Sequence, residues 1–118
     1  QQKRYEDAIN YLRKYSANEE IIGASALSLE GDCYVNLKKY DEALKAFKNA
    51  AKASDNNPHY TPFFLMKEAT VQRELKNYKA EAELYAQILK DYPTYGNENR
   101  LDIEKYLRRA ELSAGETK

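Results

Sequence analysis

Three stretches of this chain of 118 residues share one pattern. The stretches RYEDAINYLRKY, KYDEALKAFKNAAK and NYKAEAELYAQILK align on Tyr5, Tyr40 and Tyr78, so that the second follows the first by 35 residues and the third follows the second by 38. Within each stretch apolar residues recur at intervals of three and four, which is the spacing of one face of an α-helix. A repeat of this length is typical of stacked supersecondary units. The recurrence therefore predicts a helical solenoid.

A second helix is expected ahead of each of the last two stretches. Residues 24–37 contain no proline, and residues 62–75 start with a proline, which is favourable in the first turn of a helix. Two segments rich in turn-forming residues, SDNNPHYTP at 54–62 and DYPTYGNEN at 91–99, separate the units. One further helix is expected at 99–113. The chain as a whole is predicted to be all-α.

The middle unit places small and bulky residues where the two helices of a hairpin would cross. Gly31 and Ala43 are small enough to let two backbones approach closely, and Tyr34 and Phe47 can fill the space beside them. The chain resembles the tetratricopeptide repeat family, whose pattern uses such residues at these spacings. The family positions are held by Leu27, Glu30, Gly31, Tyr34, Ala43 and Phe47 in the middle unit, and by Leu65, Glu68, Ala69, Gln72, Glu81, Tyr85 and Pro93 in the next.

This resemblance implies an architecture for the whole chain. We expect a single domain over residues 1–118, built as a right-handed α-solenoid of antiparallel hairpins with about six helices. Its expected parts are the second helix of a truncated repeat at 3–16, full repeats at 24–53 and 62–91, and a capping helix at 99–113.

The chain also departs from the family pattern. Both positions that normally hold tryptophan hold leucine, and both that normally hold leucine hold glutamate. Glu81 stands where the family has alanine, and Ala82 follows it directly. A charged side chain is expensive to bury without a partner, so we expect the register of this helix to shift by one residue.

Composition and motifs exclude several classes of function. The 19 basic residues balance the 19 acidic ones, whereas a nucleic-acid-binding protein needs a one-sided basic field, so no nucleic-acid partner is expected. The single cysteine, Cys33, rules out an internal disulfide, and we expect it to be a small packing residue. The single histidine, His59, lies in a polar loop and is expected to be solvated. With no nucleophile motif, phosphate loop or metal-spaced cluster, we predict no enzyme, cofactor or metal.

The resemblance implies a concave groove lined by the first helix of each repeat. Phe63 and Met66 would supply an adaptable apolar contact, and Arg73 a bidentate charged contact, to an extended peptide or a partner helix. The alternative for Phe63 is that it only fastens the preceding loop to its helix. The expected groove residues are Ser25, Ser28, Asp32, Val35, Asn36, Phe63, Met66, Thr70, Arg73, Glu74, Glu104 and Arg108.

A well-known ligand mode of the family grips a C-terminal carboxylate through a lysine and an asparagine. The corresponding positions here are Ser28 and Asp32, and Asp32 would repel the carboxylate. We therefore expect no such clamp.

Eleven tyrosines suggest an alternative kind of binding surface. Tyr5, Tyr40, Tyr78 and Tyr85 occupy core positions of the repeats, so we expect them to pack inside. Those expected to be exposed, in loops, are Tyr60, Tyr92 and Tyr95. Exposed tyrosines would suit a glycan or small-molecule receptor, which is the second alternative function.

A narrower resemblance concerns location. The runs RYEDAINYLRKY, GASALSLEGDCYVNLKKYDEAL, TPFFLMKEA and DIEKYLRRAE are similar to a group of bacterial tetratricopeptide proteins. That group is anchored in the inner membrane, faces the periplasm, and is similar to an ancillary subunit of the protein-export translocon. The resemblance implies a cell-envelope location and an N-terminal membrane anchor in a longer protein; a cytoplasmic location is the alternative.

The leading hypothesis is a non-enzymatic scaffold that binds another protein in its groove. The first alternative is a structural or oligomerising segment of a larger protein. The first stretch reads as an unpaired second helix, and its apolar face needs cover, so self-association through this helix is expected. That face carries Tyr5, Ala8, Ile9 and Leu12.

Overall fold

The structure, a computed structural model, describes residues 2–13 and 20–116. Within these ranges the chain has seven helices joined by turns and short irregular segments, and no strand. The helices are α1 (Gln2–Arg13), α2 (Glu20–Asn36), α3 (Tyr40–Ala53), α4 (Tyr60–Glu74), α5 (Tyr78–Asp91), α6 (Tyr95–Glu98) and α7 (Ile103–Glu116). The predicted all-α, tetratricopeptide-like solenoid is confirmed.

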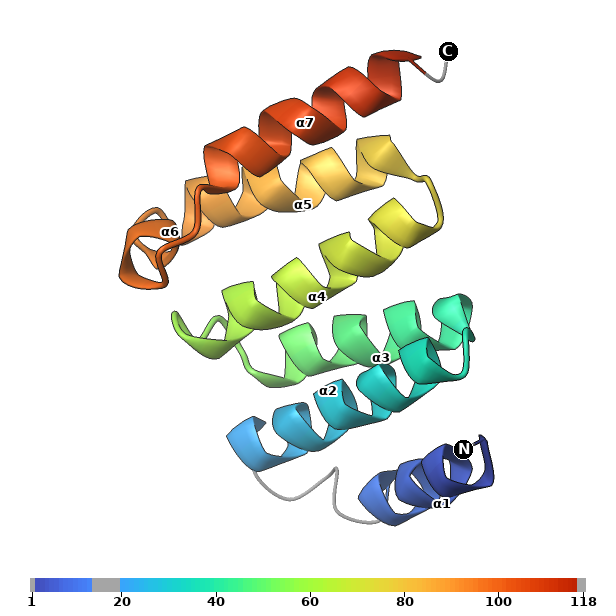
Figure 1. Cartoon of the computed structure of the whole chain (residues 1–118). Coiled ribbons are helices and arrows are strands. Elements are labelled where there is room, and N and C mark those ends of the chain that lie inside the picture. Colours follow the sequence, from blue (N-terminus) through green and yellow to red (C-terminus); the bar gives the residue numbers. More distant parts are fainter. Residues whose placement is uncertain (1, 14–19, 117–118) are drawn as a thin grey trace.

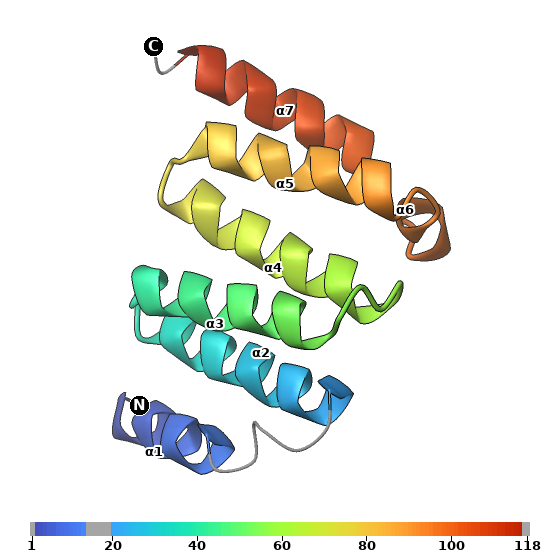
Figure 2. The same ribbon diagram turned by 180° about the vertical axis from the view of Figure 1, so that it is seen from behind.

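The helices stack in chain order from α1 at one end of the molecule to α7 at the other (Figure 1). Each long helix packs on the next one, and α7 packs on α5 past the short α6. The view from behind shows the same order, with α1 and α7 at opposite ends (Figure 2). The result is an elongated molecule that measures 40 × 29 × 20 Å along its principal axes.

The close approach expected in the first hairpin is present. A β-carbon placed on Gly31 would lie 2.5 Å from Cε1 of Phe47, so the phenyl ring packs directly on the glycine backbone. Ala43 and Phe47 on α3 are both fully buried. Glycine is required at position 31 because any side chain would displace this ring.

Helix boundaries differ from expectation at two places. α2 begins at Glu20, earlier than residue 24, and α7 begins at Ile103, later than residue 99. The late start has a local cause. Arg100 adopts a left-handed backbone with φ 57°, and the Asp102 carboxylate accepts a hydrogen bond from the Lys105 amide, which caps the new helix. The extra helix α6 lies in this connection, so the described helices exceed the expected six by one.

The register shift expected at Glu81 does not occur. The amide of Glu81 donates to the Asn77 carbonyl just as the amide of Ala43 donates to the Lys39 carbonyl, so both residues occupy the same place in their helices. Both are completely buried, at 0% exposure. The expectation was wrong because the buried carboxylate has partners, which are described below.

α1 packs on α2, and this contact buries Ile9. Tyr5 and Ala8 on the same helix are partly exposed. The side chain of Leu12 and the expected helical residues 14–16 lie outside the part of the chain that can be described. Because α2 already covers Ile9, self-association through this helix remains a prediction that rests on Tyr5 and Ala8.

Candidate functional site

A hollow of about 320 Å³ lies between α2 and α4, which are the first helices of the two full repeats. We call it the α2–α4 groove. Tyr95 and Leu101, which both follow α5 in the chain, line one side of this hollow. Phe47 and Val71, which also line it, belong to the hydrophobic core. The lining residues are Asp32, Val35, Phe47, Phe63, Met66, Lys67, Thr70, Val71, Tyr95 and Leu101.

Five of the predicted groove residues line this hollow together: Asp32, Val35, Phe63, Met66 and Thr70. They come from two helices that are adjacent only in the folded molecule, because α3 separates them in the chain. The repeat pattern therefore selected side chains that share a face, although it carried no information about the distance between them.

The remaining predicted residues lie elsewhere. Ser28 is buried, at 5% exposure, and cannot be reached from the groove. Ser25 is half-buried on α2 but does not line the hollow, and Asn36 is exposed and donates its side-chain amide to the Asp32 carbonyl. Glu74, at the end of α4, is exposed and also lies outside the lining.

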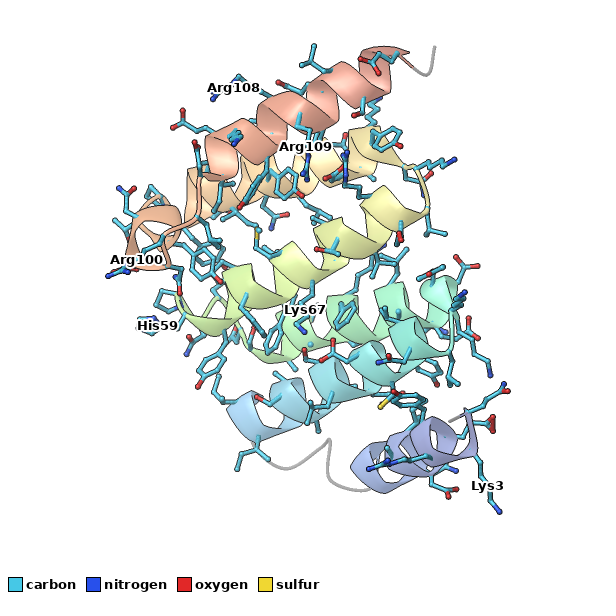
Figure 3. The ribbon with its side chains drawn as sticks, in the orientation of Figure 1. Lys3, His59, Lys67, Arg100, Arg108 and Arg109 are labelled. Atoms are coloured by element: carbon cyan, nitrogen blue, oxygen red, sulfur yellow. The ribbon has the colours of Figure 1, made fainter. Side chains whose placement is uncertain are left out.

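The two predicted residues on α7 do not extend this face. Glu104 lines a different hollow, formed by the end of α5 and the connection to α7. Arg108 is exposed and points away from the stacked helices (Figure 3). Neither residue lines the α2–α4 groove, so their part in partner binding stays a prediction.

Phe63 is the exposed apolar side chain of the groove. It retains 42% of its accessible surface, and its ring meets the edge of the Phe64 ring at a centroid distance of 5.6 Å. Phe64 is itself buried among Ala24 and Ala50, so it is Phe64 that joins α4 to the preceding hairpin. The alternative that Phe63 merely fastens the loop is not supported, because Phe64 fills that role.

Lys67 is a groove residue that the sequence argument missed. Its ammonium nitrogen lies 2.8 Å from Oδ1 of Asp32 and 5.3 Å from the centre of the Phe63 ring. Figure 3 shows Lys67 between α2 and α4. The spacing of four residues from Phe63 was a signal available in the sequence. The pairing with Asp32, which is 35 residues away, depends on how the helices pack.

The same ion pair changes the interpretation of Asp32. Asp32 was expected to repel a C-terminal carboxylate, yet its own carboxylate accepts a hydrogen bond from the Lys67 ammonium, which offsets its negative charge. Both side chains remain partly exposed, at 29% for Lys67 and 39% for Asp32. The groove thus presents one cation and one anion beside an apolar patch.

Arg73 does not belong to the groove. Its guanidinium lies 3.2 Å from Oε1 of Glu81 and 5.4 Å from the centre of the Tyr78 ring, both on α5. Its role as a charged contact for a partner stays a prediction. In the structure its guanidinium, which is 35% exposed, pairs with the buried Glu81 carboxylate.

Glu81 has two further partners. The Tyr85 hydroxyl donates to Oε2 at 2.7 Å, and Arg109 of α7 lies 3.4 Å from the same oxygen. Burial, together with the hydrogen bond to Glu81, raises the pKa of Tyr85 well above its ordinary value. The network of Arg73, Glu81, Tyr85 and Arg109 joins α4, α5 and α7.

The loop tyrosines are less exposed than expected. Tyr95 is buried, at 5% exposure, and burial raises the pKa of its hydroxyl. Tyr92 is half-buried, and its hydroxyl donates to the Asn56 side chain. Tyr60 alone of these three is exposed. The expectation for Tyr95 was wrong because α6 turns its ring into the core, and the argument for a glycan receptor loses its basis.

The two remaining candidate residues are Cys33 and His59. Cys33 is half-buried, and burial, followed by the charges of Asp32 and Glu30, raises the pKa of its thiol, which disfavours the reactive thiolate. His59 is exposed at the start of α4 (Figure 3). Among the described residues no group of three or more histidine, cysteine and acidic side chains is placed to hold a metal ion.

Comparison with known families identifies the repeat. The sequence pattern described as Tetratricopeptide repeat matches residues 24–57 and again residues 64–95, which together make up more than half of the chain. The chain therefore belongs to the tetratricopeptide repeat family. Repeats of this family generally mediate protein–protein interaction, and the proteins that carry them are typically non-enzymatic scaffolds.

No curated protein and no solved structure gives a significant match to the chain. None of the helices in the described part of the chain is both long enough and apolar enough to cross a membrane.

Proposed function

We propose that this chain is a protein-interaction module that binds a peptide or a partner helix in the α2–α4 groove. The observation that carries the proposal is the exposed ring of Phe63 at a hollow of about 320 Å³, which Met66, Val35 and Leu101 also line. When a partner covers a half-exposed aromatic side chain that lies beside other apolar groups, the buried apolar surface favours binding.

The apolar part of the groove suits a single inserted side chain. Hydrophobic anchors that fill a concave pocket contribute most of the energy of many protein interfaces, and methionine adapts to different shapes. The partner we infer therefore carries at least one large apolar residue. The same hollow also has polar groups, which are the Lys67–Asp32 pair and the Thr70 hydroxyl. They would orient the partner's backbone around that anchor.

Peptide selection tests this proposal directly. We would select from a random peptide library with the wild-type chain and measure the affinity of selected peptides for Phe63→Ala/Met66→Ala by fluorescence polarisation. Each truncation of a true anchor costs about 1–2 kcal/mol, so we expect the double variant to bind roughly a hundredfold more weakly.

A matched variant controls for the loss of exposed apolar surface. Ile22→Ala/Leu112→Ala removes two side chains that are even more exposed but lie outside the groove, and it should bind as the wild type does. Thermal melts of both variants check the fold, since Met66 also packs against the core. Selected peptides that bind the groove variant and the wild type equally well would rule out this site.

We infer a cell-envelope location for this protein, on the periplasmic side of the inner membrane. Support comes from the resemblance of the runs quoted above to membrane-anchored bacterial repeat proteins. Fractionation of cells that make the full-length protein, with protease added to intact spheroplasts, tests it. A protein that stays in the soluble fraction and is protected from protease would place it in the cytoplasm instead.

A further inference from the structure

Three lysines follow one another along the exposed face of α3. Lys45, Lys48 and Lys52 are spaced by three and four residues, so they lie on one side of the helix, and all three are exposed. They stand at the rim of a second hollow, of about 520 Å³, which α3, α4 and α5 enclose and which shares no lining residue with the α2–α4 groove. We call it the lysine hollow.

These lysines are available to a ligand. Among the described residues, no carboxylate lies within ion-pair distance of their ammonium groups, in contrast to Lys67, Arg73 and Arg109. Three like charges within two turns repel one another, and an anion would relieve that repulsion. The rest of the hollow includes exposed neutral side chains that can donate hydrogen bonds to an anion, namely Asn49, Asn56 and Gln87.

The one acidic residue in the lining does not cancel the positive rim. Glu68 lies at the bottom of the hollow and is 6% exposed. Burial raises the pKa of its carboxyl, with the charge of Lys48 acting in the opposite direction. At 6% exposure its side chain is barely accessible to a ligand at the rim, where the three lysines are exposed.

The positive charge forms a narrow line and not a broad face. Seven residues of helix separate Lys45 from Lys52, a distance of about 10 Å. Asp41 and Glu42 precede this line on α3, and Glu83 occupies the position on α5 that corresponds to Lys45. A flat anionic surface such as a membrane, or a nucleic-acid duplex, would meet these acids as well. A single extended chain can follow the lysines alone.

We propose that the lysine hollow binds an acidic peptide segment of a partner protein. Carboxylates spaced along an extended segment pair with the three ammonium groups, and the amide side chains hydrogen-bond its backbone or its carboxylates. This surface is separate from the α2–α4 groove, so one chain can hold two segments at once, on different faces.

The test uses a fluorescently labelled peptide of alternating glutamate and glycine, titrated with the whole chain at low salt and followed by anisotropy. Removing three exposed charge contacts should weaken binding about tenfold in Lys45→Gln/Lys48→Gln/Lys52→Gln. The control, Lys3→Gln/Lys39→Gln/Lys105→Gln, removes the same charge from exposed positions elsewhere and should bind within about twofold of the wild type.

Further measurements separate the alternatives. Phe63→Ala/Met66→Ala should bind the acidic peptide normally, which distinguishes this surface from the groove. The proposal fails if the wild type does not bind the peptide, or if the control variant loses as much affinity as the α3 variant. Binding to phosphatidylserine vesicles that needs the three lysines, without peptide binding, would overturn it in favour of a lipid surface.

Discussion

The two full repeats solve the same packing problem in different ways. In the first hairpin, Ala43 and Phe47 are buried with no polar group at either position. In the second, the residues 38 positions later are Glu81 and Tyr85, which are just as deeply buried. The two repeats also differ at a third position, where the first has Val35 and the second has Arg73.

These three differences belong together. The Tyr85 hydroxyl needs an acceptor and finds Glu81, and the buried Glu81 carboxylate needs positive charge and finds Arg73 and Arg109. A buried charge without such partners costs several kcal/mol, so glutamate at position 81 depends on the arginines that face it. The comparison teaches that positions 43 and 81 share their burial, while the size and polarity of the side chain at each depend on its neighbours.

The comparison also explains which face each repeat offers. Val35 packs against the cluster of Ala43, Phe47 and Val71 and also lines the groove, whereas Arg73 pairs with Glu81 on α5 and does not line the groove. The second repeat uses its charge to hold α7 through Arg109, and the first uses Asp32 to hold Lys67 of α4. The groove is apolar at its centre because the charge at position 73 is used internally.

The largest effect should come from removing both arginines from the network. In Arg73→Ala/Arg109→Ala the Glu81 carboxylate stays buried without a cation. Breaking a buried ion pair in this way typically costs 3–5 kcal/mol. Both guanidiniums are partly exposed, at 35% and 49%, so we expect a loss of about 3 kcal/mol, near the lower end of that range, in urea-melt experiments.

A variant that copies the first repeat controls this prediction. Arg73→Val/Glu81→Ala/Tyr85→Phe installs the residues found at the corresponding positions 35, 43 and 47. Replacing a buried charged network by apolar groups is often neutral or stabilising, so this triple variant should melt near the wild type. If the triple variant is instead as unstable as the double variant, the two repeats are not interchangeable and the comparison breaks.

The next effect concerns the apolar contact of the first repeat. Gly31→Leu places a side chain where the Phe47 ring lies, and overpacking of this kind costs about 1–3 kcal/mol. Gly115→Leu is the matched control, because a β-carbon there meets nothing within 4 Å. An equal midpoint in denaturant for the Gly31 variant and the wild type would show that the helices do not cross at this residue.

The smallest effect is a pH dependence that Tyr85 gives to the second repeat. Burial, and then the hydrogen bond to Glu81, raise the pKa of Tyr85 above the value of 10.0 for a free tyrosine. The folded state therefore holds this proton more tightly than the unfolded state does. The contribution is fully present below pH 10 and is lost as pH rises above it, through the folded-state pKa.

Tyr85→Phe tests this pH dependence. Phenylalanine, which the first repeat has at this place, cannot ionise, so the variant should lose less stability than the wild type between pH 9 and the alkaline end of the melts. Urea melts at matched pH values measure the difference. Parallel stability curves for the two proteins would mean that Tyr85 does not ionise differently in the folded and unfolded states.

The sequence by itself determined the helical repeat, the crossing at Gly31 and the helices that line the groove. The physical reason is that these features depend on short-range spacing. Apolar residues three and four apart must lie on one helix face, and a glycine opposite a phenylalanine allows close approach without reference to the rest of the chain. The resemblance to the repeat family implied that Asp32, Val35, Phe63, Met66 and Thr70 lie on the concave face, and the structure brings these five together.

Only the tertiary structure decided which polar side chains meet. Lys67 pairs with Asp32 across two helices, and Arg109 reaches Glu81 from α7, 28 residues further along the chain. Tyr95 is buried because the connection after α5 folds into α6 over the core, which turn-forming residues alone do not specify. Such pairings depend on distances of about 3 Å between atoms of separate helices, and those distances are set by packing, which residue spacing along one helix does not encode.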